Sequence, residues 1–439
     1  MLDRLLDRVE QRDYTIGIIG LGYVGLPLAL TSIAKGFKVL GFDVDQSRVT
    51  QLMAGGTLIK HLPGEMFAGP IAEGRFEATS DMARLSEPDA ILIAVPTPLD
   101  KHQEPDLTYV VKSTESIAAA LRPGQLVVLE STTWPGTTRE VMLPILEAGG
   151  LKAGSDFFLA FSPEREDPGN PDFSNSVIPK VVGADDEASR ALATKVYDNL
   201  VSRTVPVASS ATAEAVKLTE NIFRSVNIAL VNELKLIFDK MDINVWEVIE
   251  AAKSKPFGYM AFYPGPGLGG HCIPIDPFYL TWKAREFEIS TRFIELAGEI
   301  NTAMPRYVVA RLAEALDRQT GRGLNGARIL LIGMAYKKNV DDMRESPALK
   351  LTELLEHRGS AVDYHDPHIP EIPKTRDHPE FAGRRSVELS AENLAGYDAV
   401  LVATDHDDVD WPHVVEHARL VVDTRNVCGR IESDKVVRA

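Results

Sequence analysis

The segment from Thr15 to Asp43 reads TIGIIGLGYVGLPLALTSIAKGFKVLGFD. It opens with a short apolar run typical of a buried strand, passes through a glycine-rich turn and continues as an apolar helix to about Ala34. A second strand-like run follows from Lys38 to Phe42. This strand–helix–strand order predicts a β-α-β unit that opens a doubly wound parallel sheet.

The rest of the chain divides by pattern into three stretches. Apolar runs of strand length continue the first sheet at residues 90–94, 126–129, 157–160 and 180–182. Helical patterns then dominate at 211–240, 245–252 and 292–317. A second α/β unit begins at 327–333 and continues through 346–357, 361–364, 399–403 and 420–423.

We therefore predict an α/β protein of three domains, because 439 residues exceed the length that one ordinary hydrophobic core supports. The first is an N-terminal Rossmann domain (1–205). The second is a central all-helical domain with a long spine helix (206–318), and the third is a C-terminal Rossmann-like domain (319–439). The Gly-rich polar stretch 318–326 suits the second boundary.

Charge and cysteine content restrict the class of partner. The formal net charge is -16, whereas binding to nucleic acid or to an anionic membrane depends on a clustered basic face. The apolar runs are too short to span a bilayer. Cys272 and Cys428 are the only cysteines, too few for a disulfide framework, and His271 beside Cys272 lacks the further ligands of a zinc site. We expect a cytoplasmic protein that binds no nucleic acid, membrane or metal.

The first glycine-rich turn predicts a dinucleotide site. Gly20 would permit the tight turn, Gly22 would let the backbone approach a pyrophosphate, and Gly25 would let helix and strand pack closely. The helix N-terminus offers free N–H groups and partial positive charge to the phosphates. Asp43, after the second strand, would accept hydrogen bonds from a ribose diol and repel a 2′-phosphate, which favours NAD over NADP.

Further cofactor contacts are expected around this turn. Tyr23 and Val24 belong to the turn itself. Arg48 is either a solvated helix residue or a neighbour of the adenosine. Thr97 and Thr132 follow strands at the ligand-binding edge of the sheet, where each hydroxyl would either cap a helix or contact the cofactor.

A second glycine-rich segment carries the candidate nucleophile. Residues 264–277 read PGPGLGGHCIPIDP, and so many glycines let a ligand lie against the backbone. Cys272 is either an inert apolar filler or a reactive thiol. Asp276 would share a helix face with Cys272 if a helix begins here, and it would then accept a proton or orient a water.

Other polar residues are candidates for the same chemistry. Lys217 and Asn221 lie four residues apart and share one face of the long helix. Glu164 follows a strand of the first sheet, where side chains point into the ligand crevice. Arg344 stands near the start of a C-terminal helix, beside Tyr336-Lys337, where it would bind a pyrophosphate or pair with adjacent acids.

Together these motifs resemble the UDP-glucose/UDP-N-acetylhexosamine 6-dehydrogenase family from about Thr15 to Arg425. The cysteine loop is similar to the family's Gly-x-Gly-Gly-x-Cys followed by Asp276-Pro277. The helix signature is similar to Lys217-x-x-x-Asn221. The C-terminal signature is similar to Tyr336-Lys337 with Arg344-Glu345-Ser346.

This resemblance implies NAD-dependent oxidation of a sugar C6 alcohol to a carboxylate, with two NAD reduced per product. It implies that the Cys272 thiolate attacks the C6 aldehyde, and that the resulting thiohemiacetal is oxidised to a thioester and hydrolysed. The implied catalytic residues are Cys272, Lys217, Asp276, Asn221, Glu164 and Thr132. The implied substrate-binding residues are Glu164, Arg165, Lys217, Asn221, Tyr263, Gly267, Gly269, Tyr336, Lys337 and Arg344.

Within this resemblance Lys217 would stabilise the oxyanion, Asn221 would hold it or the sugar, and Asp276 would manage the proton and water. Thr132 and Glu164 would flank the same water and sugar. Lys337 and Arg344 would clasp the substrate.

The run from Lys255 to Leu268 looks like the branch that acts on UDP-N-acetylglucosamine, whereas the UDP-glucose branch usually has Phe where Leu268 stands. UDP-glucose and UDP-N-acetylmannosamine stay open as alternative substrates. A two-electron hydroxyacid-type dehydrogenase and a catalytically inactive NAD-sensing protein stay open as alternative functions. The resemblance also implies a homodimer or a larger homo-oligomer.

Overall fold

A computed structural model describes residues 1–59, 62–100, 104–165, 178–270, 272–375 and 378–439, with the backbone alone for Cys272. The described chain divides into two compact units. The first comprises Met1–Glu220 with Phe278–Ile289, and the second comprises Asn221–Pro277 with Ser290–Ala439.

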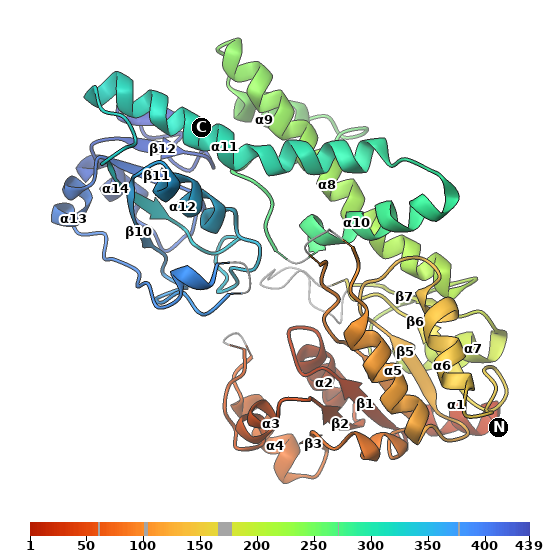
Figure 1. The fold of residues 1–439 in the computed structure, drawn as a ribbon. Coiled ribbons are helices and arrows are strands. Elements are labelled where there is room, and N and C mark those ends of the chain that lie inside the picture. Colours follow the sequence, from red (N-terminus) through yellow and green to blue (C-terminus); the bar gives the residue numbers. More distant parts are fainter. Residues whose placement is uncertain (60–61, 101–103, 166–177, 271, 376–377) are drawn as a thin grey trace. The chain divides into compact units, whose positions relative to one another are not determined.

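The first unit is built on an eight-stranded sheet, which lies behind helices α5 and α6 in Figure 1. Its strand order is β3-β2-β1-β4-β5-β6-β7-β8, and every neighbouring pair is parallel except β6 with β7. The strands are β1 (Thr15–Ile19), β2 (Lys38–Phe42), β3 (Phe76–Thr79), β4 (Ala90–Ile93), β5 (Leu126–Leu129), β6 (Phe158–Phe161), β7 (Lys180–Gly183) and β8 (Thr204–Val207). The order reverses between β1 and β4, and ligands of such sheets bind at the carboxyl ends of these strands.

Helices cover both faces of this sheet, because its central strands are buried on both sides. One core joins α1 (Leu2–Glu10), α2 (Gly25–Ala34), α3 (Gln46–Met53), α4 (Glu65–Ala72) and α7 (Glu187–Asp198) to alternate strand residues. Helix α5 (Thr108–Ala120) packs on α6 (Leu143–Glu147). A 3-10 helix, η1 (Met82–Ser86), and a π-helix, η2 (Thr138–Met142), also belong to this unit.

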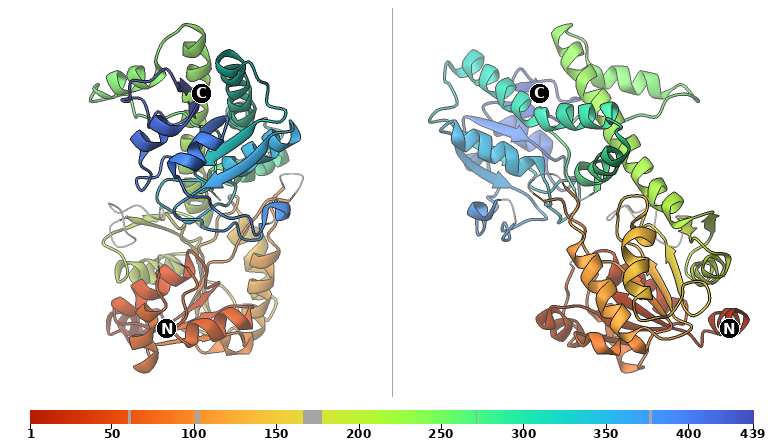
Figure 2. Two further views of the ribbon diagram at one scale, coloured as in Figure 1. Left: turned by 90° about the vertical axis from the view of Figure 1, so that its left-hand side faces the viewer. Right: turned by 45° about the vertical axis from the view of Figure 1, so that its right-hand side comes forward.

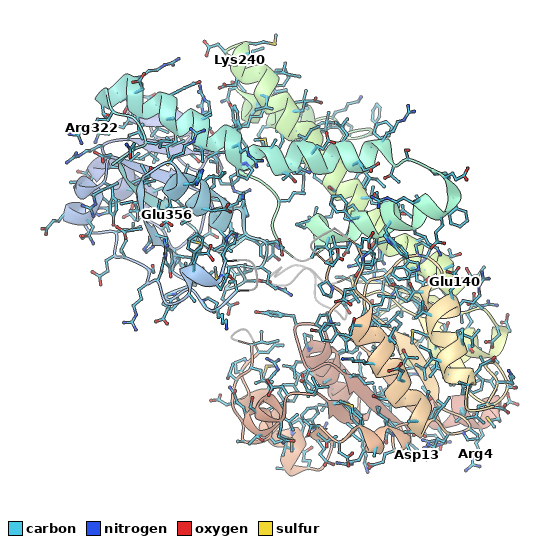
Figure 3. All side chains as sticks on the ribbon, viewed as in Figure 1. Arg4, Asp13, Glu140, Lys240, Arg322 and Glu356 are labelled. Carbon is cyan, nitrogen blue, oxygen red and sulfur yellow. The ribbon has the colours of Figure 1, made fainter. Side chains whose placement is uncertain are left out.

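Four helices follow in sequence: α8 (Ser210–Lys240), α9 (Val245–Lys253), α10 (Cys272–Ala284) and α11 (Arg292–Thr320). The side chain of Lys240 marks the end of α8 in Figure 3. A 3-10 turn, η3 (Arg285–Phe287), follows α10. Helix α11 ends at Gly321, whose φ of 66° is a left-handed conformation that glycine adopts without strain. In the second unit α8 and α11 cross (Figure 2). Asn232 of α8 donates a hydrogen bond to Asn301 of α11.

The second unit also contains a five-stranded parallel sheet of order β10-β9-β11-β12-β13. Its strands are β9 (Arg328–Ile332), β10 (Ala361–His365), β11 (Ala399–Val402), β12 (Val421–Asp423) and β13 (Val436–Arg438). Ile329 and Leu331 face the core with α11 and α12 (Pro347–His357), while Leu330 and Ile332 face the core with α13 (Ala391–Gly396) and α14 (Trp411–His417). A 3-10 turn, η4 (Pro379–Phe381), packs in the first of these cores.

The predicted architecture is confirmed: an N-terminal Rossmann sheet, a helical centre with a long helix, and a second Rossmann-like sheet. The predicted strand and helix runs recur within a few residues of their expected limits. Three strands were not predicted, namely β3, β8 and β13. The antiparallel pairing of β6 with β7 also departs from a purely parallel sheet.

Candidate active site

The first glycine-rich turn connects β1 to α2 as its glycines require. Gly20 has a φ of 97°, and a Cβ there would lie 2.5 Å from the Ala94 carbonyl oxygen. A Cβ on Gly25 would lie only 1.9 Å from the Gly20 carbonyl oxygen. A Cβ on Gly22, in contrast, would meet no atom of the described residues within 4 Å. Two glycines therefore serve the packing of the turn, and the third leaves its backbone open to a ligand.

Asp43 and Arg48 both contact this turn. One Asp43 oxygen accepts a hydrogen bond from the Leu21 backbone N–H at 3.2 Å, and the other accepts from the Asp45 N–H at 3.0 Å. Arg48 donates to the Leu21 carbonyl at 2.8 Å, and its Nε lies 3.7 Å from the Asp43 carboxylate. The Arg48 guanidinium therefore lies beside the turn, and its contact with the adenosine stays a prediction.

Thr97 and Thr132 lie in loops at the carboxyl edge of the sheet. Thr97 is buried, and its carbonyl accepts a hydrogen bond from the Tyr279 hydroxyl of α10 at 2.7 Å. Thr132 is half-buried in the loop after β5. The far end of that loop leads into η2, where Glu140, labelled in Figure 3, pairs with Lys283 of α10 at 2.7 Å. Helix α10 is thereby tied to the loops that carry both threonines.

Glu214 on α8 anchors the same loop. Its buried carboxylate accepts hydrogen bonds from the Gly136 N–H at 2.5 Å, the Thr138 N–H at 2.9 Å and the Thr138 hydroxyl at 2.7 Å. Burial raises the pKa of Glu214, while the bonds from Thr138 and Gly136 oppose that rise.

The structure brings Lys217 and Glu164 together in the first unit. Lys217 is buried on α8, and its Nζ donates to the Glu164 backbone carbonyl at 2.6 Å. The Glu164 side chain accepts from the Arg165 N–H at 2.6 Å and from Lys180 Nζ at 2.9 Å. Arg165 forms an ion pair with Glu220 of α8. The segment after β6 is therefore bound to α8 at two points.

Asn221 and Asp276 meet in the second unit. Asn221 Nδ2 donates to the Asp276 carboxylate at 2.6 Å, and both residues are buried. Helix α10 begins at Cys272, as expected, so Asp276 lies in its first turns on the face of residue 272. The Cys272 side chain and His271 lie outside the described residues.

The cysteine loop (residues 264–272) is clamped at its start by two helix asparagines. The Gly265 N–H donates to Asn232 Oδ1 of α8 at 3.1 Å. Asn232 Nδ2 donates to Asn301 of α11 at 2.9 Å, and Asn301 donates to the Ser225 carbonyl at 3.1 Å. A Cβ on Gly265 would lie 2.6 Å from the Arg425 guanidinium.

The end of the cysteine loop lies against the C-terminal sheet's first connection. The Gly270 N–H donates to the Arg344 carbonyl at 2.9 Å. A Cβ on Gly269 would lie 2.6 Å from Tyr336 Cβ, and one on Gly270 would lie 2.8 Å from the Tyr336 ring. Gly267 has a φ of 145° and packs near Pro347. The glycines therefore let this loop approach the 336–347 segment closely, which brings four predicted substrate residues together.

The side chains of three predicted substrate residues, Arg344, Lys337 and Tyr263, lie in the following surroundings. The Arg344 guanidinium pairs with the Asp342 carboxylate at 2.6–3.0 Å, which is the adjacent-acid pairing left open by the sequence. Lys337 is half-buried next to Tyr336. Tyr263 packs on α9, where it stacks on Trp246 and donates to Glu250 at 2.6 Å.

Sequence reasoning did not single out Lys180, Glu214, Asn232 or Arg425. Each is a polar residue within or next to an apolar stretch, and that mismatch is the signal that could have found them. Among the described residues, no three or more His, Cys, Asp or Glu side chains are arranged to hold a metal ion. None of the helices in the described parts of the chain is long and apolar enough to cross a bilayer.

The first turn fits NAD on its own geometry. The open backbone at Gly22 and the N-terminus of α2 suit a pyrophosphate, and the Asp43 carboxylate suits a ribose diol. Bound there, NAD would supply a hydride acceptor, while Gly20, Gly22, Gly25 and Asp43 would hold it.

Comparison with known proteins gives a consistent result. Three models of the UDP-glucose/GDP-mannose dehydrogenase family match this chain: the NAD binding domain at residues 14–201, the central domain at 211–303 and the UDP binding domain at 330–430. Protein CapL of Staphylococcus aureus is 36% identical, over 96% of this chain and 97% of its own length. A UDP-N-acetyl-D-glucosamine 6-dehydrogenase of Pseudomonas aeruginosa is 35% identical, over 90% and 92%.

Solved structures agree with this result. The UDP-D-ManNAc dehydrogenase of Pyrococcus horikoshii has a TM-score of 0.86 at 32% identity, covering 97% of this chain and 98% of its own. The resemblance drawn from the motifs is thus confirmed, and so is NAD as the cofactor. The chain belongs to the UDP-glucose/GDP-mannose dehydrogenase family and is an NAD-dependent UDP-sugar dehydrogenase with NAD-binding, central helical and UDP-binding parts.

Proposed function

We propose that this enzyme oxidises UDP-N-acetylglucosamine to the corresponding uronate through a thioester on Cys272. The observation that carries the proposal is the Asn221–Asp276 hydrogen bond of 2.6 Å, in the first turns of the helix that Cys272 begins. A buried carboxylate held at that position is suited to manage the protons of a neighbouring thiol and water.

The proposed reaction has four stages. The C6 alcohol first loses a hydride and a proton to give an aldehyde. The Cys272 thiolate then forms a C–S bond to C6 and the former carbonyl oxygen takes up a proton, which gives a thiohemiacetal. Loss of the second hydride and of the hydroxyl proton gives a thioester, and water cleaves the C–S bond to release the carboxylate, the thiol and a proton. Each of the two oxidations requires a hydride acceptor, which NAD would supply when bound.

The chain's own residues have distinct proposed roles in these stages. The buried Lys217 ammonium would stabilise the oxyanion at C6. Asn221 would orient Asp276, which would take the proton of the thiol and of the water. Glu164 and Thr132 would flank the water that attacks the thioester. Lys337 and Arg344 would bind the pyrophosphate through charge.

UDP-N-acetylglucosamine is the preferred substrate in this proposal. Support comes from the sequence between Lys255 and Leu268, and from relatives named for N-acetylated UDP-sugars. UDP-N-acetylmannosamine and UDP-glucose are the alternatives that an assay must separate.

The decisive experiment counts NADH formed per UDP-sugar consumed, with UDP-N-acetylglucosamine, UDP-N-acetylmannosamine and UDP-glucose in parallel. Native enzyme should form two NADH with the first sugar. Cys272→Ser should lose the second oxidation or stall before hydrolysis. Cys428→Ser is the matched control, because Cys428 is buried in the C-terminal core and burial raises its pKa to about 12. One NADH per sugar, or full activity of Cys272→Ser, would move the assignment to a two-electron dehydrogenase.

We further propose that the enzyme works as a homodimer or a larger homo-oligomer in the cytoplasm. The long helix exposes Phe223, Leu230 and Ile237 at seven-residue spacing, each 47–49% accessible. Apolar side chains in such a row are suited to packing against a second copy. A reducing compartment would keep the Cys272 thiol available.

A further inference from the structure

Three charged residues from neighbouring strands meet at the carboxyl edge of the first sheet. Glu130 directly follows β5, Glu164 follows β6, and Lys180 is the first residue of β7. Lys180 Nζ lies 2.6 Å from a Glu130 oxygen and 2.9 Å from a Glu164 oxygen. Lys180 therefore bridges two carboxylates.

The antiparallel direction of β7 creates this arrangement. Phe161 of β6 pairs with Gly183 of β7 in antiparallel register. Glu164 lies three residues beyond Phe161, past the end of β6, and Lys180 lies three residues before Gly183, so continuing the same antiparallel register places them opposite each other. A parallel β7 would begin at the other edge of the sheet, away from Glu164.

The exposure of the three side chains increases from Glu130 through Lys180 to Glu164. The side chain of Glu130 is 0% exposed, that of Lys180 is 6% exposed and that of Glu164 is 13% exposed. The closed end is completed by the buried Tyr197, whose hydroxyl donates to Glu130 at 2.5 Å. The accessible end is the Glu164 carboxylate.

The charges around Lys180 favour its protonated, ammonium form. Burial disfavours the charged form of Lys180, but the Glu130 and Glu164 carboxylates outweigh that effect and raise its pKa. Burial raises the pKa of Glu130, and the ammonium opposes that rise. Burial also raises the pKa of Tyr197, which therefore stays an O–H donor.

We propose that Lys180 is a positioning residue that holds the Glu164 carboxylate ionised and oriented, and that Glu130 and Tyr197 hold Lys180 in turn. The inference rests on the proposed function, in which Glu164 flanks the hydrolytic water. A buried ion cluster is weak evidence for a stabilising role, because desolvation offsets much of the attraction. Here one member of the cluster, the Glu164 carboxylate, also accepts a hydrogen bond from the Arg165 N–H.

Two further basic residues contact Glu164. The Arg165 N–H donates to one carboxylate oxygen, and Lys217 donates to the backbone carbonyl. The Arg165 guanidinium pairs with Glu220. Lys180 contacts the Glu164 carboxylate with its ammonium group, and Glu130 is the second acid of the cluster.

The test measures the acid limb of the kcat–pH profile, which is the fall of kcat toward low pH. In this proposal the fall follows protonation of the Glu164 carboxylate. Lys180→Met removes the bridging charge and should move that limb about 1 to 3 units to higher pH. Glu130→Gln removes the competing acid but keeps an acceptor, and should move the limb to lower pH. Lys180→Arg should restore the native limb. Lys152→Met, which breaks the exposed Lys152–Glu147 pair of 3.0 Å, is the control and should change nothing.

A second readout is the covalent intermediate. With a displaced Glu164 the hydrolysis step should slow, so Lys180→Met should accumulate a substrate adduct on Cys272 that intact-mass measurement detects. An unmoved limb, or shifts of the same sign in Lys180→Met and Glu130→Gln, would overturn the inference. If Lys180→Met does not fold, the inference is tested by the direction in which Glu130→Gln moves the acid limb, and by whether Lys180→Arg keeps the native limb. Failure of the proposed function looks different, because native enzyme would then form neither adduct nor a second NADH.

Discussion

Replacing Asn232 with alanine should release the start of the cysteine loop. The substitution leaves two buried groups without their partners: the Gly265 N–H, bound at 3.1 Å, and the Asn301 amide oxygen, bound at 2.9 Å. Each buried group left unpaired costs about 1 to 3 kcal/mol. The better helix propensity of alanine returns only about 0.5 kcal/mol. We expect a net loss of about 1.5 to 5.5 kcal/mol in the stability of the second unit.

Hydrogen exchange at the peptide covering residues 261–270 measures the local part of this loss. A cost of about 1 to 3 kcal/mol at the Gly265 N–H corresponds to about 5- to 150-fold faster exchange. Asn227→Ala is the matched control, because Asn227 lies on the same helix and its amide donates to the Phe223 carbonyl of that helix at 2.7 Å instead of to the cysteine loop. Its exchange should match that of native enzyme.

The clamp also predicts a kinetic effect. A loosened cysteine loop should lower kcat with UDP-sugar while leaving NAD affinity unchanged, because the turn that fits NAD lies in the other unit. If residues 261–270 exchange at the same rate in Asn232→Ala and Asn227→Ala, the clamp reasoning is refuted.

Three further outcomes are expected. Gly25→Ala should lose NAD binding, because the added Cβ would lie 1.9 Å from a carbonyl oxygen. Gly22→Ala should keep the native thermal unfolding temperature, but calorimetry should show that it binds NAD at least about tenfold more weakly. Native affinity in Gly22→Ala would show that no ligand approaches that backbone. Asp43→Asn should lose the charge and keep one of the two backbone bonds, to Leu21 or to Asp45, so NAD affinity should fall about tenfold and discrimination against NADP should narrow. Unchanged discrimination would contradict the ribose role. Leu230→Lys should weaken self-association in sedimentation experiments, and Met66→Lys, equally exposed at 49%, should not; equal sedimentation of the two variants would remove the helix from the interface.

Continuous apolar runs were sufficient to predict the central strands. The residues of β4 and β5 are buried on every side, so almost every position must be apolar and the run is visible in the sequence. The three strands that were missed, β3, β8 and β13, are all edge strands of their sheets. Edge strands pair on one side and carry polar residues or proline, as Pro206 in β8 does, so their pattern is weak.

The turn chemistry of the NAD loop was also predictable from residue spacing. Gly20, Gly22 and Gly25 act through their own backbone and their nearest elements, and such local constraints are readable along the chain. The same holds for the pairs Lys217/Asn221 and Cys272/Asp276, whose spacing places them on common helix faces once a helix is assigned.

Partners distant in the sequence could not be derived in this way. The direction of β7 brings Lys180 to Glu164 and Glu130, and the crossing of α8 with α11 brings Asn232 to Asn301 and Gly265. Local pattern predicted the buried strands, the long helices and the residue types available for chemistry. Which buried polar groups satisfy one another depended on chain packing, because a hydrogen bond or ion pair is set by the position and direction of both partners in space.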